Sequence, residues 1–138
     1  MEKAEALTRD NTRMTVVIAA NYGGHWDITQ ATRKVAEQVK AGQLEPSDIT
    51  DDLIQEHLSI GDLPMPDLLI RTAGEQRISN FLLWQQAYTE LFFSPVYWPG
   101  FDSRAFDLAV EEYYTRQRRF GMRTEQLEQS QLGDQNIA

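Results

Sequence analysis

The feature that most limits the fold of this chain is a short apolar run that ends in an arginine and a turn. Residues Asp67–Arg71 (DLLIR) are followed by Thr72–Gly74 and then by an amphipathic stretch, Ile78–Tyr88. A run of this kind is typical of a strand, and the apolar spacing after the turn indicates a helix. The sequence therefore predicts a strand–turn–helix unit with Arg71 at the carboxyl end of the strand.

Other segments continue this alternation of strands and helices. Thr15–Ala20 is β-branched and continuously apolar, which is typical of a strand buried on both faces, and Leu91–Phe93 is predicted as a third short strand. Helices are predicted at Glu2–Arg13, at Trp26–Lys40, after a cap at Thr50, and from Asp102 or Ser103 to Gly121. The order predicts an α/β fold with a parallel β-sheet, right-handed crossovers and flanking helices. Three strands make a small sheet, so the chain resembles a piece of a larger one.

Composition narrows the class of protein. The chain has 138 residues, 41% of them hydrophobic and 25% charged, with a net charge of −8. This balance is typical of one globular domain, and no apolar run approaches the roughly 20 residues of a membrane-spanning helix. The acidic charge argues against nucleic acid as a partner. The N-terminus lacks a signal-peptide pattern, so we expect a cytoplasmic protein. We expect a domain at residues 1–122 and a polar, disordered tail at 123–138.

The residues around the first turn indicate an anion site. Ligands of open parallel sheets bind outside the carboxyl ends of the strands, where Arg71 is expected. Arg77 follows, and then Ser79 and Asn80 lie at the predicted helix start, where free N–H groups favour an anion. Two guanidinium groups and a hydroxyl suit a diphosphate. The alternative, that Arg71 and Arg77 pair with Glu75 or other surface carboxylates, stays open. The run is not a G-x-x-x-x-G-K-[ST] phosphate loop.

The block Asp67–Gln85 resembles the signature of the cis-prenyltransferases, of the undecaprenyl diphosphate synthase type. Four further blocks agree with that family in order and spacing: Ile18–Gly24, Tyr88–Phe93, Trp98–Phe101 and Arg118–Gly121. The resemblance covers about Ala4 to Gly121. It implies the fold of the C-terminal half of such an enzyme.

The resemblance also implies roles for individual residues. The diphosphate of isopentenyl diphosphate would be bound by Arg71, Arg77, Ile78 and Ser79. Glu90 would be a carboxylate ligand of Mg²⁺, which prefers carboxylates and diphosphate oxygens. Gln76 lies where family members often carry His or Gln, and it is left out of the metal set. Arg119 and Gly121 match an R-x-G element that in some members reaches the diphosphate, or they form a helix end with favourable cations.

The implied function is transfer of a prenyl group. Such an enzyme condenses isopentenyl diphosphate with an allylic diphosphate, such as farnesyl diphosphate, to give a cis-polyprenyl diphosphate. One example is undecaprenyl diphosphate, the lipid carrier of cell-wall synthesis. The resemblance further implies a homodimer and a transient association with the membrane through the lipid product.

The catalytic part of the family pattern is missing from this sequence. The family's Asp-Gly-Asn-x-x-Trp stretch, which carries the aspartate beside the allylic diphosphate, does not occur here. We therefore expect no catalytic residue in this chain and no activity of the chain alone. We interpret it as a truncated gene product, one part of a split gene or a fragmentary gene model. The alternative is a non-catalytic partner subunit of a heteromeric cis-prenyltransferase.

Two groups of side chains are expected to be structural. His25 and His57, the only two histidines, are expected at the surface or in structural contacts. Five aromatic residues are expected in the core or at a dimer contact: Phe81, Trp84, Phe92, Phe93 and Trp98.

Overall fold

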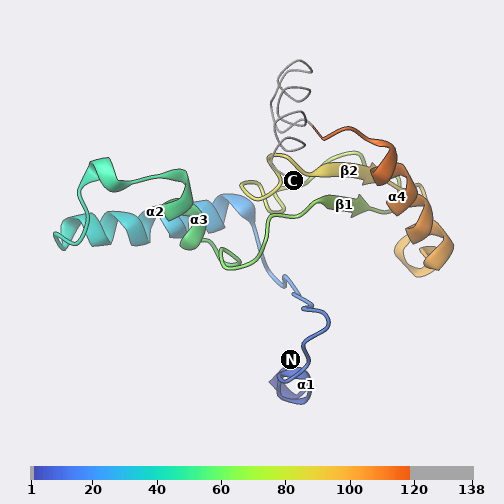
Figure 1. The fold of residues 1–138 in the computed structure, drawn as a ribbon, viewed down its shortest axis with the longest axis horizontal. Coiled ribbons are helices and arrows are strands. Elements are labelled where there is room, and N and C mark those ends of the chain that lie inside the picture. The colour runs from blue at the N-terminus through green and yellow to red at the C-terminus, as the bar shows by residue number, and fades with distance from the viewer. Residues whose placement is uncertain (1, 119–138) are drawn as a thin grey trace, which may run out of the picture.

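A computed structural model of the chain describes residues 2–118, in which helices and a small sheet alternate (Figure 1). The helices are α1 (Glu2–Thr8), α2 (Gly24–Lys40), α3 (Asp51–Glu56) and α4 (Ser103–Thr115). The strands are β1 (Leu68–Arg71) and β2 (Glu90–Phe93), and short 3₁₀ helices lie at Pro46–Asp48 and Trp98–Gly100. The predicted tail, 123–138, lies outside the described residues, as do Arg119 and Gly121.

The two strands form a parallel sheet, which confirms the predicted α/β class. Leu68 lies opposite Glu90, and Arg71 lies opposite Phe93. The ladder extends past β2, because the Ser94 amide donates to the Arg71 carbonyl at 2.7 Å. In a parallel pair the carboxyl ends of both strands lie at the same end of the sheet. Arg71, which ends β1, and Glu90, which begins β2, therefore lie at opposite ends of the sheet. Helix α4 packs beside β2 (Figure 1).

Helices α2 and α3 lie side by side in a second part of the molecule (Figure 1). Their contact buries Ala31, Val35 and Leu58. The predicted cap of α3 is confirmed, because the Thr50 hydroxyl accepts from the Leu53 amide at 3.2 Å. Helix α2 ends as predicted, since Gly42 takes the left-handed backbone (φ 68°) that glycine favours after a helix.

The structural role expected of His57 is also confirmed. Its Nδ1 lies 2.8 Å from the Leu53 carbonyl, and its Nε2 lies 3.1 Å from the Gln38 Nε2. Because the Gln38 amide can only donate, the His57 Nε2 accepts and its Nδ1 carries the proton. This pair ties the end of α3 to α2. His25 is exposed at the start of α2, as expected.

The strand predicted at Thr15–Ala20 is wrong. The segment is irregular, and Met14, Val16, Val17 and Ile18 have exposed fractions of 76%, 70%, 52% and 66%. A strand needs a neighbour for its backbone hydrogen bonds, and within residues 2–118 β1 and β2 pair only with each other. In Figure 1 the segment leads from α1 to α2 away from the sheet. The apolar, β-branched sequence of this segment is therefore not sufficient to form a strand without a neighbouring strand.

The helix predicted at Ile78–Tyr88 is also wrong, because the segment forms a series of turns. Ser79, Asn80 and Leu82 have positive φ values of 47°, 62° and 45°, which a right-handed helix cannot contain. A single helical turn survives, from the Gln86 amide to the Leu82 carbonyl at 3.0 Å. The predicted diphosphate site therefore lacks the helix N-terminus expected for it.

The small core consists of aliphatic rather than aromatic side chains. Its buried hydrophobic residues within 2–118 are Ala31, Val35, Leu58 and Ala109. None of the five aromatic residues expected in the core or at a dimer contact is buried, and Trp98 is 74% exposed. Their assignment to the core is wrong, whereas a dimer contact stays a prediction. Within residues 2–118, no helix combines the length and the apolar character needed to cross a bilayer.

Candidate diphosphate site

Arg71 is the centre of the candidate site, at the carboxyl end of β1. Its Nη1 donates to the Ser79 Oγ at 2.9 Å and to the backbone carbonyl of Arg77. The side chain thus spans from the strand to a loop eight residues further on. The structure therefore brings together three of the predicted ligands, Arg71, Arg77 and Ser79. The fourth, Ile78, lies between the last two and is partly buried.

The turn after Arg71 is held against the segment that follows β2. Ala73 and Gly74 have φ values of 67° and 68°, and no neighbouring atom would meet a side chain added at Gly74. Their amides donate to the carbonyls of Val96 and Ser94 at 2.8 and 2.9 Å. In contrast, no hydrogen bond within residues 2–118 involves the amides of residues 75–80. Those amides are therefore not engaged as donors within the described residues.

Arg77 already has a partner, because its Nη2 forms an ion pair with the Glu75 carboxylate. The sequence left this alternative open for Arg77. The side chains are 64% and 38% exposed, so solvent screens the pair. Exposed pairs of this kind stabilise a protein by about 0–1 kcal/mol. A diphosphate, which carries more charge than Glu75, can displace that carboxylate at small cost.

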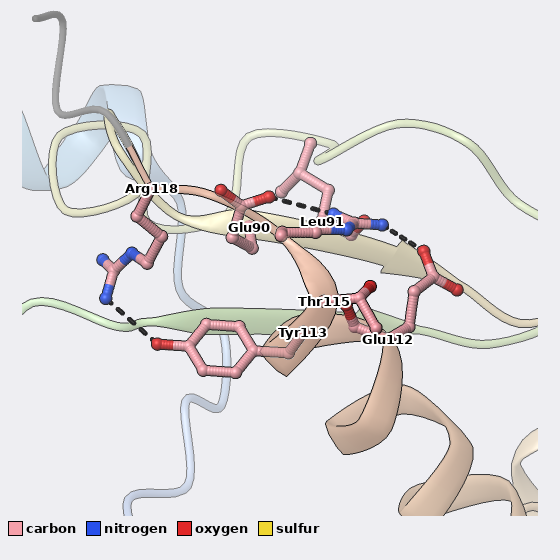
Figure 2. Close-up of polar contacts among 7 residues, drawn as sticks. Glu90, Leu91, Glu112, Tyr113, Thr115 and Arg118 are labelled. Carbon is pink, nitrogen blue, oxygen red and sulfur yellow. Dashed lines mark hydrogen bonds and ion pairs between the residues drawn. The ribbon is translucent and has the colours of Figure 1, made fainter. Parts of the chain in front are cut away.

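Glu90 begins β2 and is also paired. Its Oε2 lies 3.0 Å from the Arg116 Nη1, which in addition donates to the Leu91 carbonyl at 2.9 Å (Figure 2). Arg116 also pairs with Glu112, one helical turn earlier in the chain (Figure 2). The hydrogen bonds that Arg116 donates to Glu112 and, with a smaller effect, to Glu90 raise the pKa of its guanidinium above the usual value. Arg116 therefore stays charged and neutralises Glu90.

The described residues do not form a magnesium site on their own. Within residues 2–118, no group of three or more His, Cys, Asp or Glu side chains is arranged to hold a metal ion. The carboxylate of Glu90 is neutralised by Arg116, and it lies at the edge of the sheet opposite Arg71. Any Mg²⁺ held by Glu90 would need further ligands from outside these residues.

Asn80 was expected beside Ser79 at a helix start, but the sequence interpretation did not foresee its contacts with α2. Its carbonyl accepts from the Gly24 amide at 2.6 Å, and its Oδ1 accepts from the His25 amide at 2.8 Å. It follows Ser79 directly and so joins the candidate site to the start of α2. The sequence signal for this contact is at Gly23 and Gly24. A helix that begins at two glycines has no side-chain cap of its own, so its first amides need an acceptor from elsewhere.

A buried carboxylate beside this junction was also missed. Asp27 is 2% exposed and accepts from the Tyr22 hydroxyl at 2.8 Å and from the Ser59 amide and hydroxyl at 2.9 and 2.7 Å. Burial alone would raise the pKa of Asp27, but the hydrogen bonds from Ser59 and Tyr22 outweigh it and lower the pKa. Burial raises the pKa of Tyr22, and Asp27 raises it further. No pattern in the sequence indicates that this helical aspartate faces inward.

Of the predicted element Arg118–Gly121, only Arg118 is described. Its Nη1 donates to the Asp67 carboxylate, just before β1. It also donates to the Tyr113 hydroxyl at 3.1 Å (Figure 2). The hydrogen bond that Arg118 donates to Asp67 raises the pKa of the Arg118 guanidinium. The chain after α4 is thereby drawn to the amino end of β1, away from Arg71.

Comparison with known proteins agrees with this fold. A sequence model of the undecaprenyl diphosphate synthase family matches residues 1–121. A ditrans,polycis-undecaprenyl-diphosphate synthase ((2E,6E)-farnesyl-diphosphate specific) of Pseudomonas putida is 57% identical over 93% of this chain and 51% of its own length. The protein of the same name from Vibrio cholerae is 57% identical over 91% of this chain and 50% of its own.

A solved structure supports the same relationship. The crystal structure of lavandulyl diphosphate synthase from Lavandula x intermedia, in complex with dimethylallyl diphosphate, matches with a TM-score of 0.82 and 44% identity. The match covers 87% of this chain and 52% of that one. The chain thus spans about half the length of the relatives it matches. Together these matches show that the chain belongs to the undecaprenyl diphosphate synthase family of cis-prenyltransferases.

Proposed function

We propose that this chain supplies the isopentenyl diphosphate-binding half of a cis-prenyltransferase. The observation that carries the proposal is the convergence of Arg71 with Ser79 and the Arg77 backbone at the carboxyl end of β1. The same loop carries the Arg77 side chain and the amides of residues 75–80, which make no hydrogen bond within residues 2–118. This set of donors matches the several oxygens of a diphosphate.

The complete reaction would join isopentenyl diphosphate to an allylic diphosphate such as farnesyl diphosphate. The isopentenyl double bond attacks the allylic carbon as its diphosphate leaves, and loss of a proton creates a new cis double bond. Arg71, Arg77, Ile78 and Ser79 would orient the isopentenyl partner and balance the charge of its diphosphate. None of them activates the allylic leaving group. The product would be a cis-polyprenyl diphosphate, such as undecaprenyl diphosphate.

We further propose Glu90 as one ligand of Mg²⁺ in the assembled enzyme. A bound Mg²⁺ would neutralise diphosphate charge, and Glu90 would have to leave Arg116 to take part. Glu90→Gln would then reduce the dependence of diphosphate binding on Mg²⁺ in an assembly that contains the rest of the enzyme. Equal Mg²⁺ dependence in the wild type and the variant would contradict this role.

The test of the diphosphate site is calorimetric titration of the chain with isopentenyl diphosphate. We expect weak binding that Arg71→Ala and Arg77→Ala each weaken by about tenfold or more, since each removes a charge-assisted hydrogen bond. Arg33→Ala is the matched control, because Arg33 is exposed on α2 and its side chain donates, within residues 2–118, a single hydrogen bond, to the Gln30 Oε1 at 3.3 Å. Affinities unchanged in both site variants would overturn the proposal.

An assay of turnover separates this function from that of a non-catalytic subunit. The chain alone is expected to form no polyprenyl product from farnesyl and isopentenyl diphosphates. Supplying the other half of a relative should give product that depends on Arg71. A non-catalytic subunit would instead leave the product yield unchanged in Arg71→Ala. The homodimer, the cytoplasmic location and the contact with membrane through the product stay predictions.

A further inference from the structure

Helix α2 begins without a cap from its own neighbourhood. The first amides of a helix have no partners inside it, and a side chain just before the helix usually accepts from one of them. Here the N-cap is Gly23, which has no side chain to do so. The amides of Gly24 and His25 must therefore find acceptors elsewhere or remain open to water.

Asn80 provides both acceptors, from 55 residues further along the chain. Its carbonyl binds the Gly24 amide at 2.6 Å, and its Oδ1 binds the His25 amide at 2.8 Å. Its backbone is left-handed, with a φ of 62°, a conformation that asparagine tolerates better than most residues. Asn80 thus acts as the N-cap of a helix to which it does not belong.

The surrounding contacts show that this approach is close. A Cβ added to Gly23 would lie 3.0 Å from the Asn80 Nδ2. One added to Gly24 would lie 2.7 Å from the Leu83 Cγ and 3.0 Å from its backbone nitrogen. Phe81 meets the ring of Tyr22 edge-on at a centroid distance of 5.8 Å. The two glycines therefore let residues 80–83 lie directly on the start of α2.

From this geometry we propose that Asn80 is a positioning residue for the diphosphate site. It fixes the end of the Arg77–Ser79 loop to α2 and thereby holds the Ser79 hydroxyl at the Arg71 guanidinium. The proposal rests on the proposed function for the role of that loop. Asn80 need not touch the diphosphate, since both of its described acceptor atoms face α2.

Three substitutions separate the parts of this role. Asn80→Gly removes the side-chain acceptor but permits the left-handed backbone and keeps the carbonyl bond to Gly24. Asn80→Ala removes the same acceptor and adds backbone strain. Asn80→Asp keeps the acceptor and places a favourable negative charge at the helix start. Asn21→Gly is the matched control, because Asn21 has a similar φ of 54° but lies outside the loop.

Two readouts on the full chain test the proposal. Without ligand, amide hydrogen exchange at His25 should speed up about fivefold to tenfold in Asn80→Gly, whereas Gly24 stays protected. Nitrogen-15 relaxation should then show greater motion of the Ser79 amide. In calorimetry with isopentenyl diphosphate, the affinity should fall about fivefold in Asn80→Gly, more in Asn80→Ala, and return toward wild type in Asn80→Asp.

The outcomes distinguish this proposal from the proposed function. If the wild-type chain fails to bind isopentenyl diphosphate, the proposed function is contradicted. Amide hydrogen exchange at His25 and nitrogen-15 relaxation at Ser79 then still decide whether Asn80 holds the loop. If wild type binds and Asn80→Gly binds equally well with an unchanged Ser79 amide, the positioning role is overturned. Equal losses in Asn21→Gly would also overturn it. Thermal melts of each variant exclude unfolding as the cause.

Discussion

Two regions of this molecule have similar sequences and different structures. Thr15–Ala20 and Leu68–Arg71 are both short apolar runs, and the first is richer in β-branched residues. Only the second forms a strand, because β2 lies beside it in parallel. The first remains irregular and exposed. The difference shows that a strand is a property of a pair of segments, since the hydrogen bonds that define it come from a neighbour.

The same comparison explains where the candidate site is found. The turn after β1 is fixed by bonds from Ala73 and Gly74 to the segment after β2. These bonds fix the position of the loop after the turn relative to Arg71. The turn after Ala20 is held by side-chain hydrogen bonds instead. The Tyr22 hydroxyl donates to Asp27, which in turn accepts from the Ser59 hydroxyl. The first irregular segment therefore ends where these long-range contacts begin.

The largest expected effect comes from placing proline in each region. Ser94→Pro removes the amide that donates to Arg71 at the end of the sheet, in a residue only 3% exposed. It should destabilise the chain by about 3 kcal/mol or more. Val17→Pro should change stability by less than about 0.5 kcal/mol, because Val17 lies in the exposed segment. Urea unfolding measures both, and equal losses would show that residues 14–20 are structured in solution.

The next effect concerns the buried Asp27, whose pKa is lowered in the folded chain. Because the pKa is lower in the folded chain, the ionised carboxylate stabilises the fold. This stabilisation is complete above the unfolded pKa of about 3.9 and is lost as the pH falls through the pKa of the folded chain. Asp27→Asn should therefore cost about 2 kcal/mol at neutral pH and progressively less below about pH 4. Urea unfolding at pH 7, 4 and 3 checks this. A difference that is constant with pH would contradict it.

The smallest effect is on association of the exposed segment. Apolar side chains at Val16, Val17 and Ile18 offer an unpaired run to other copies, so concentrated chain should aggregate. Val17→Lys should reduce light scattering without a change in the melting temperature. Thr12→Lys is the control for added charge, because Thr12 lies outside the apolar run. Equal scattering in both variants would indicate that another surface drives association.

Much of the local structure follows from short-range rules. The cap at Thr50, the end of α2 at Gly42 and the strand before Arg71 depend on residues a few positions apart. The approach of Ser79 to Arg71 was also predicted, from motif chemistry and the resemblance. Each of these features requires only nearby sequence or a known pattern. They were accordingly predicted correctly.

The features that escaped prediction depend on distant contacts. Residues 78–88 have the spacing of a helix, yet left-handed residues at Ser79, Asn80 and Leu82 replace it with turns. Asn80 is held there by bonds to Gly24 and His25. The inward position of Asp27 similarly depends on Ser59. A propensity or a period cannot reveal such partners, because neither refers to residues on another segment.

The cap that Asn80 provides has a consequence for the order of events during synthesis. Helix α2 leaves the ribosome 55 residues before the residue that completes its first turn. At about 5–20 residues per second, that interval lasts roughly 3–11 s. Until Asn80 emerges, the first amides of α2 remain open to water and the helix start is free to fray. The start of α2 and the loop beside Arg71 would then become ordered together, late and in one step.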